Sequence, residues 1–139
     1  MEINSPFGTQ TVDPDTLITL PAGMLGFPEL TRFKLFHEEG KPTVFWLQSV
    51  DDAAVRFPVT DPERLNVNYE LTLSDQEVAD LQLASIEDLV ILVTLAKGEQ
   101  DDAGIHANFL APILINIAQR VGLQKPLNEV HSKVVIHAS

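Results

Sequence analysis

The sequence predicts a mainly β protein, either a sandwich or a barrel, and three observations support this fold class. Nine prolines are spread along the 139 residues and separate short apolar segments. Several of these segments alternate apolar and polar residues, which is typical of a strand with one buried face. Short strands with turn signals between them are typical of sandwiches and barrels.

The predicted strands follow one another along the chain. Val55, Phe57 and Val59 share one face of a strand that alternates in this way. Pro58 cannot donate a backbone hydrogen bond, so we expect this strand at a sheet edge or beside a bulge. The predicted strands cover residues 32–36, 55–59, 69–73, 89–95, 113–115 and 134–136.

The segment from residue 89 to residue 95 is apolar on both faces and rich in β-branched side chains. This favours a central strand covered on both sides, although a buried helix can have the same pattern. In the strand, Ile91 and Val93 should lie on one face and Val90 and Leu92 on the other. We expect all four side chains to be buried.

One helix start is marked by a capping box, Ser74-Asp75-Gln76-Glu77. The Ser74 hydroxyl can accept a hydrogen bond from the amide of Glu77, whose carboxylate can accept one from the amide of Ser74. Asp75 adds negative charge at the positive end of the helix dipole. The sequence therefore predicts a short helix over residues 75–81 and a single further turn over residues 85–88.

Length and composition place further bounds on the protein. A chain of 139 residues fits one domain, so we expect residues 1–139 to form a single domain. The absence of cysteine excludes disulfides and thiolate zinc sites. The first residues have neither the basic stretch nor the apolar run of a secretory signal. Because the longest apolar run is also much shorter than a membrane span of about 20 residues, we expect a cytoplasmic protein with no membrane insertion.

The chain is strongly acidic. Nine basic residues against 20 acidic ones give a formal net charge of −11. Nucleic-acid binding depends on neutralising phosphates, so we expect no direct contact with RNA or DNA. An acidic surface favours encounter with a basic protein partner, and the alternative is that the charge only keeps the protein soluble and monomeric.

Residue patterns for catalysis do not form a coherent set. Gly23 and Gly26 are not followed by the lysine and hydroxyl pair of a phosphate-binding loop, and we expect them to serve a turn. The four histidines lack the spacing of a helical zinc motif; His131 and His137 could share a strand face, but surface histidines are far commoner than ligands. Adjacent carboxylates in loops are usually solvated charge. We therefore expect no enzymatic activity, no metal and no cofactor.

Several segments resemble the FliW family, and their order and spacing make the resemblance specific. They run over roughly residues 2 to 127. The matching segments are Phe7-Gly8, Leu17 to Pro28, Phe45 to Asp52, Phe57 to Pro62, Tyr69 to Leu71, Ser74-Asp75 and Ala107 to Asn116. The sequence departs from the family pattern at His106, at Pro58 and at Lys125-Pro126, where threonine, valine and an apolar pair are usual. We therefore carry no family contact over to residues after Gln124.

The resemblance implies both a fold and a function. The fold is a small, mostly antiparallel β-barrel, here with one or two short helices. The function is that of a flagellar assembly factor that binds flagellin and antagonises the RNA-binding translational repressor CsrA. In this family, unassembled flagellin sequesters FliW and leaves the repressor free to silence flagellin translation. Secretion of flagellin releases FliW, which then antagonises the repressor.

Five residues are the candidates for partner binding. Asp51, Asp52, Asp101 and Asp102 lie in predicted loops beside matching segments, where they could steer a basic partner. Asn108 opens a stretch, residues 108–112, that could be a bulged strand entry in which its side chain bonds backbone groups. The alternative function is a small acidic barrel that binds a small ligand or catalyses a reaction in its mouth. That alternative requires a pocket on the order of several hundred Å³ with convergent polar groups.

Overall fold

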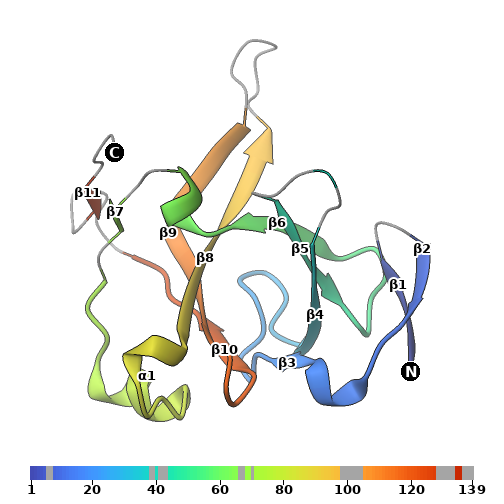
Figure 1. Ribbon diagram of the computed structural model, residues 1–139, viewed down its shortest axis with the longest axis horizontal. Helices are drawn as coiled ribbons and strands as arrows, with labels where there is room; N and C mark the ends of the chain where they lie inside the picture. Colours follow the sequence, from blue (N-terminus) through green and yellow to red (C-terminus); the bar gives the residue numbers. More distant parts are fainter. Residues whose placement is uncertain are drawn as a thin grey trace.

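Seven strands close into a barrel in the computed structural model of the chain (Figure 1). The structure describes residues 1–5, 8–37, 40, 44–65, 68–69, 71–97, 105–127 and 134–135. The barrel strands are β3 (Ile18–Thr19), β4 (Arg32–His37), β5 (Phe45–Ser49), β6 (Arg56–Thr60), β8 (Leu89–Lys97), β9 (Ile105–Asn116) and β10 (Val121–Gln124). Their order is β10-β3-β4-β5-β6-β8-β9, with β9 returning to β10, and only β10 and β3 pair in parallel. The predicted mainly β fold, a small and mostly antiparallel barrel, is confirmed.

Two small sheets and several short helical segments lie outside the barrel. β1 (Glu2–Ser5) pairs with β2 (Gly8–Thr11), and β7 (Asn68–Tyr69) pairs with β11 (Val134–Val135). The helical segments are η1 (Pro14–Thr16), η2 (Pro62–Leu65), α1 (Asp75–Asp80) and η3 (Ile86–Asp88). In Figure 1 the β1–β2 sheet lies at the right of the barrel and α1 at its lower left. Within the described residues, we find no helix with the length and apolar character to cross a membrane.

The interior of the barrel is a packed apolar core. Phe33 of β4, Leu47 of β5 and Ile113 of β9 are fully buried and belong to one cluster. Phe27 and Phe57 pack against this cluster and meet edge to face with their ring centroids 5.9 Å apart. These side chains lie inside because successive residues of a strand point to opposite faces of the sheet.

β6 accommodates a proline because its pairing is incomplete. Pro58 lies opposite Trp46 of β5, but β6 pairs with β8 only at Val59 and Thr60. The missing N–H of Pro58 therefore falls where one side of β6 has no ladder to complete. The predicted edge position is confirmed locally, although β6 as a whole lies inside a closed sheet.

β8 and β9 form a long antiparallel pair that is interrupted by a bulge. The register shifts between Leu92 and Thr94 of β8, where β9 inserts residues 109–112. Pro112 lies in this stretch and has no N–H to donate, so a regular ladder could not continue through it. Its carbonyl instead accepts a hydrogen bond from the amide of Lys125 at 2.9 Å. The predicted bulge is confirmed, but it lies within β9, which already begins at Ile105, and not at the entry of a strand.

The centre of β8 is covered on both faces, as expected for a central strand. Leu92 and Val93 point to opposite sides and are both buried, with Leu92 in the barrel core. Val90 packs against the same core but is only half-buried, and so is Ile91. The prediction that all four are buried is wrong for these two, because they lie near the end of the barrel where the chain enters β8 from η3.

The capping box is formed as predicted. The amide of Glu77 donates to Ser74 Oγ at 3.1 Å, and the amide of Ser74 donates to Glu77 Oε1 at 2.8 Å. The helix ends at Asp80, one residue before the predicted end. The predicted single turn is η3, capped by Ser85.

One predicted strand is wrong. Alternation favoured a strand over residues 69–73, but β7 contains only Asn68 and Tyr69, and residues 71–73 are outside any strand. These residues lead directly into the helix cap at Ser74, so the backbone must turn into α1 instead of following a sheet. The predicted strand over residues 134–136 is β11 as far as Val135, and Ile136 lies outside the described residues.

We expect residues 1–139 to unfold as one cooperative unit. The early strand β3 pairs with the late strand β10 at Thr19 and Val121, so loss of either one opens the barrel. Urea unfolding followed by far-ultraviolet dichroism and by the fluorescence of Trp46, the single tryptophan, should give coincident transitions. Two separate transitions, or two stable halves after limited proteolysis, would contradict this prediction.

Candidate protein-binding surface

Asp51 and Asp52 lie in the turn between β5 and β6, and a buried side chain holds this turn. Gln48 Nε2 donates to the carbonyls of Ser49 and Val55 at 3.0 and 3.3 Å. The Ser49 hydroxyl accepts hydrogen bonds from the amides of Asp51 and Asp52 at 3.2 and 3.0 Å. Both aspartates are exposed. The sequence thus places two carboxylates on a turn of fixed shape.

The two aspartates differ in how much free charge they present. Arg32 binds Asp51 through two hydrogen bonds, Nη2 to Oδ1 at 2.5 Å and Nε to Oδ2 at 3.3 Å. The hydrogen bonding from Arg32 lowers the pKa of the Asp51 carboxyl, against the opposing effect of desolvation, and charge attraction adds to the lowering. Asp52 uses Oδ1 to accept a hydrogen bond from the amide of Ala54 at 3.0 Å. Asp52 is therefore the stronger source of uncompensated negative charge in this turn.

Asn108 lies at the start of the β9 bulge and is exposed. Its side-chain Oδ1 accepts a hydrogen bond from the amide of Leu110 at 2.9 Å. The predicted bonding of Asn108 to backbone is confirmed. This bond fixes the bulge so that Leu110, an exposed apolar residue, is presented beside Asn108.

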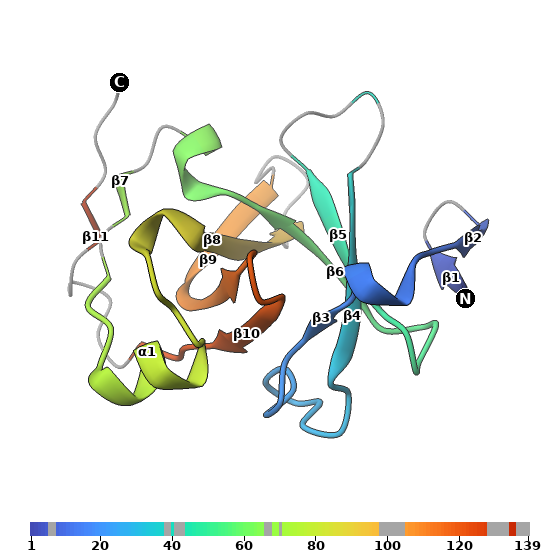
Figure 2. The same ribbon diagram turned by 60° about the horizontal axis from the view of Figure 1, so that its bottom comes forward.

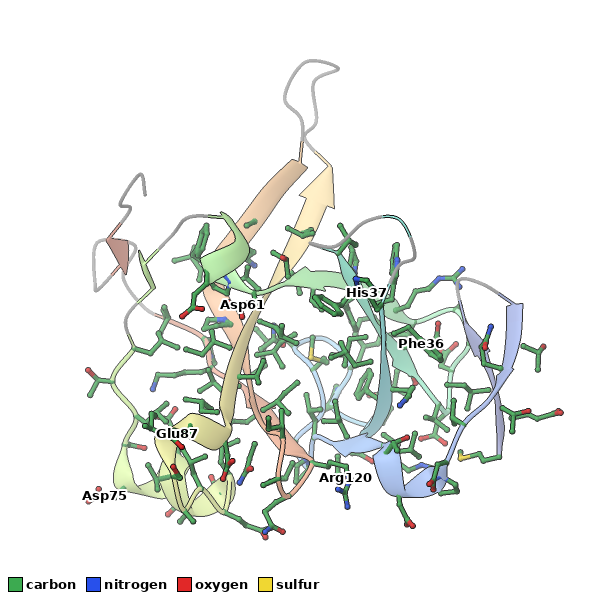
Figure 3. The ribbon with its side chains drawn as sticks, in the orientation of Figure 1. Phe36, His37, Asp61, Asp75, Glu87 and Arg120 are labelled. Carbon is green, nitrogen blue, oxygen red and sulfur yellow. The ribbon has the colours of Figure 1, made fainter. Side chains whose placement is uncertain are left out.

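The predicted site residues do not form one described surface. The β5–β6 turn lies at the lower right of Figure 1, whereas β9 begins near the top. Asp101 and Asp102 lie outside the described residues. Acidic side chains are also present on the opposite side, since Figure 3 shows Asp75, Glu87 and Asp61 along the left of the molecule.

A hollow of about 320 Å³ lies between three segments that are distant in the sequence. Pro21 and Ala22 follow β3, Gly122 and Leu123 belong to β10, and Asp80 ends α1. Figure 2 shows α1 and the chain after β3 on either side of β10. Asp80 supplies the charged group among these five lining residues. The hollow is therefore mostly apolar with a carboxylate at one wall.

An ion pair holds α1 against the chain that follows β10. Lys125 Nζ lies 2.6 and 2.7 Å from Glu77 Oε1 and Oε2, and about one fifth of each side chain is exposed, 20% and 19%. Burial by itself raises the pKa of Glu77, but the hydrogen bonds from Lys125 and Ser74 together with the charge of Lys125 outweigh it and lower that pKa. Lys125 thus places an ion-paired charge at a position where the resemblance to the family had led us to expect an apolar residue.

The described residues show no arrangement suited to metal binding. No group of three or more histidine, aspartate or glutamate side chains among them could hold a metal ion. His37 is exposed and its ring contacts that of Phe45 in a tilted arrangement, with ring centroids 5.0 Å apart, on the right of the barrel in Figure 3. His131 and His137 lie outside the described residues.

Comparison with known proteins identifies the family. The sequence matches the family profile described as FliW protein over residues 2–138. The flagellar assembly factor FliW of Azoarcus sp. strain BH72 is 48% identical over 142 residues, covering 98% of this chain and 97% of that protein. The chain belongs to the FliW family. The flagellar assembly factor FliW of Chromobacterium violaceum is 39% identical, covering 88% of this chain and 89% of that protein.

A solved structure supports the same family. A crystal structure of the flagellar assembly factor FliW matches this FliW-family chain with a TM-score of 0.85 and 28% identity, covering 96% of this chain and 94% of that one. The resemblance that the sequence segments indicated is thereby confirmed.

The hollow was not predicted from the sequence, although two of its lining residues lie in a segment that the sequence singled out. Pro21 and Ala22 belong to the segment from Leu17 to Pro28 that resembles the FliW family. Their neighbours in the hollow, Asp80 and Leu123, come from segments 58 and more residues away in the chain. Only the closure of the barrel brings these parts together.

We expect Glu77→Gln to lower the free energy of unfolding by about 1–2 kcal/mol at neutral pH, because it removes the Lys125 ion pair and weakens the capping box. The folded-state pKa of Glu77 is lowered from 4.5, so its contribution is present above that pH. It is lost as the pH falls through the folded-state value. The gap between wild type and variant in urea unfolding should therefore narrow as the pH falls below 4.5 and through the lowered folded-state pKa of Glu77.

Glu87→Gln is the control for this prediction, since Glu87 is an exposed carboxylate on η3. Its replacement should change the free energy of unfolding by less than about 0.5 kcal/mol. A gap for Glu77→Gln that stays constant from pH 7 down to the acid unfolding of the wild type would contradict the role of its ionised form.

Proposed function

We propose that this protein is a cytoplasmic flagellar assembly factor that binds flagellin and antagonises a CsrA-type translational repressor by protein–protein binding. Through this competition it couples the level of unassembled flagellin to flagellin translation. The observation that carries the proposal is membership of the FliW family over nearly the whole chain. We propose no contact with nucleic acid and no enzymatic step.

The charge of the molecule is consistent with this role. A net charge of −11 opposes binding to an RNA backbone but favours approach to a basic RNA-binding protein. Asp52, exposed on the fixed turn between β5 and β6, supplies part of that charge. Exposed apolar residues such as Leu110 and Leu25 provide contact points for apolar segments of unassembled flagellin.

The alternative, a ligand or catalytic site in the barrel mouth, finds less support. The barrel interior is filled by fully buried side chains such as Phe33, Leu47 and Ile113. The hollow beside α1 reaches the lower end of the usual size range for ligand pockets, about 300 Å³. It brings only one charged side chain, Asp80, and a small-ligand site needs several convergent polar groups.

The test is a binding measurement with purified proteins. The chain should bind flagellin and, separately, the repressor of the same organism at micromolar concentration or below. Adding flagellin to the complex with the repressor should lower the bound repressor fraction, because the proposal requires the two to compete. Isothermal titration and size-exclusion chromatography would measure both steps.

A control distinguishes specific binding from non-specific attraction between the acidic chain and any basic protein. Lysozyme, a basic protein of unrelated function, should not form a complex at about 0.15 M salt, where exposed charges are largely screened beyond about 8 Å. Absence of binding to both flagellin and the repressor would overturn the proposed function.

A further inference from the structure

The hollow beside α1 has a size and a mostly apolar lining that suit one apolar side chain. Its walls are Pro21 and Ala22 on one side and Asp80 on the other, and Gly122 and Leu123 of β10 also line it (Figure 2). Its volume of about 320 Å³ leaves room for a large side chain together with part of a neighbouring residue. The apolar lining favours burial of a hydrocarbon group over that of a polar one.

The chain segment that carries Pro21 and Ala22 continues to a further exposed apolar residue and is held by hydrogen bonds. Leu25, at 54% exposure, is one of the exposed large hydrophobic residues of the described chain. Its amide donates to Gln124 Oε1 at 2.8 Å, and Gln124 Nε2 donates to the carbonyl of Ala111 at 3.1 Å. The segment that carries Pro21, Ala22 and Leu25 is therefore tied to β10 and β9 before any partner arrives.

Asp80 places a charged group at one wall of the hollow. Its Oδ1 accepts a hydrogen bond from Gln76 Nε2 at 2.8 Å, which orients the carboxylate across one turn of α1. Asp80 is exposed, and an ionised carboxylate can accept further hydrogen bonds beyond this one. A cation placed beside the apolar side chain in the hollow could bind there.

We propose that this hollow binds a protein segment in which a leucine-like side chain enters between Ala22 and Leu123 while an adjacent lysine or arginine pairs with Asp80. The inference rests on the proposed function, because it assigns a place where a protein partner docks. Charge complementarity selects the occupant, since a second copy of this chain would bring a like charge of −11. The combination of apolar wall and carboxylate selects an apolar residue next to a basic one.

The first experiment uses the full chain labelled with ¹⁵N and a capped tetrapeptide of leucine followed by arginine between two glycines. Amide signals of Ala22, Asp80, Gly122 and Leu123 should shift on titration to about 5 mM peptide, as expected for a dissociation constant of roughly 1 mM. A peptide with serine in place of leucine, and one with glutamate in place of arginine, should each shift them several-fold less. No shift at these amides would overturn the inference.

The second experiment uses two variants with matched controls. Ala22→Phe fills the hollow from an exposed position, and Ala54→Phe adds the same ring at an exposed position of the β5–β6 turn. Asp80→Asn removes the carboxylate charge, and Asp15→Asn removes one from exposed η1. The two hollow variants should weaken binding of the tetrapeptide about tenfold or more, while the controls bind like wild type.

The same variants, titrated with flagellin and with the repressor, separate the two proposals. Weaker binding of either protein by Ala22→Phe and Asp80→Asn, with unchanged controls, supports the hollow as a docking site. If wild type and all variants bind both proteins equally and the peptide leaves the hollow amides unmoved, the docking site is wrong and the proposed function stands. If wild type binds neither protein, the proposed function is wrong, and the peptide titration alone decides whether the hollow is a receptor.

Discussion

Gly23→Ala is expected to lower the free energy of unfolding by roughly 3 kcal/mol or more. Gly23 has a φ of +71°, a conformation that costs a side chain about 1–2 kcal/mol. A Cβ atom at this position would also lie 2.3 Å from the carbonyl oxygen of Phe27 and 2.7 Å from Pro28 Cα. Both neighbours are backbone atoms, so the turn itself must move to make room.

Gly26→Ala is the matched control for this substitution. Gly26 also has a positive φ, +86°, but a Cβ atom there would meet nothing within 4 Å. Its substitution should therefore cost only the conformational term, about 1–2 kcal/mol. Urea unfolding of the two variants and the wild type measures the difference, and equal midpoints for both variants would show that the close approach to Phe27 is relieved without cost.

The Gly23 turn also lies against the hollow, since Pro21 and Ala22 come directly before it. The amide of Gly23 donates to the carbonyl of Leu20 at 2.8 Å, which closes the turn on the end of β3. A displaced turn would move Ala22 relative to Leu123. The part of the sequence that resembles the FliW family thus specifies a backbone shape, and that shape forms one wall of the candidate docking site.

Signals that span a few residues were predictable from the sequence. The capping box joins Ser74 and Glu77, three residues apart, and the bond from the Leu110 amide to Asn108 spans two. Pro58 predicted incomplete strand pairing, because the missing N–H is a property of the residue itself. These features need no knowledge of the rest of the fold.

Alternation of apolar and polar residues was not sufficient to predict a strand correctly at residues 69–73. Residues 69–73 alternate as a strand would, yet residues 71–73 lead into α1, because the strength of the Ser74 cap decides the backbone direction there. The burial of β8 was predicted too uniformly for a related reason. A run of apolar residues indicates which side chains can be buried, whereas the position of Val90 and Ile91 near the end of the barrel decides which ones are.

The candidate site was less predictable than the fold because it depends on distant contacts. Arg32 and Asp51 are 19 residues apart, and their pairing follows from the neighbouring strands β4 and β5. Glu77 and Lys125 are 48 residues apart and meet only once the barrel has closed. A count of charges in the sequence gives −11 but does not say which of them remain uncompensated at the surface.

Replacing Asp51, Asp52, Asp101 and Asp102 by asparagine is expected to slow association with the basic repressor about tenfold at low ionic strength. The variant carries a net charge of −7 in place of −11, and steering by charge changes association rates by about 10- to 1,000-fold. Removing Asp51 has an additional consequence, since it releases the charge of Arg32 that the aspartate now balances. The region around the turn would then repel a cation. Stopped-flow association rates against ionic strength measure the effect.

The matched control replaces four exposed carboxylates elsewhere in the chain, Glu2, Asp15, Glu29 and Glu63, by their amides. It has the same net charge of −7, so it tests whether position matters. We expect it to slow association less than the first variant does, and the two rates should converge at about 0.5 M salt, where screening acts within a few ångströms. Equal slowing at every ionic strength would show that only total charge steers the partner, and wild-type rates in both variants would remove charge from the mechanism.

Both variants should retain the stability of the wild type within about 0.5 kcal/mol per substitution. Asp51 and Asp52 of the first variant and all four carboxylates of the second are exposed, and exposed carboxylates contribute little to folding. Flagellin binding by the same variants can be compared with repressor binding. Contacts through apolar residues such as Leu25 and Leu110 are screened by salt less than contacts between charges. If the first variant loses repressor steering but keeps its affinity for flagellin, the acidic turn and the apolar positions serve different partners. If it loses both equally, binding of both partners depends on the charge of the same acidic residues.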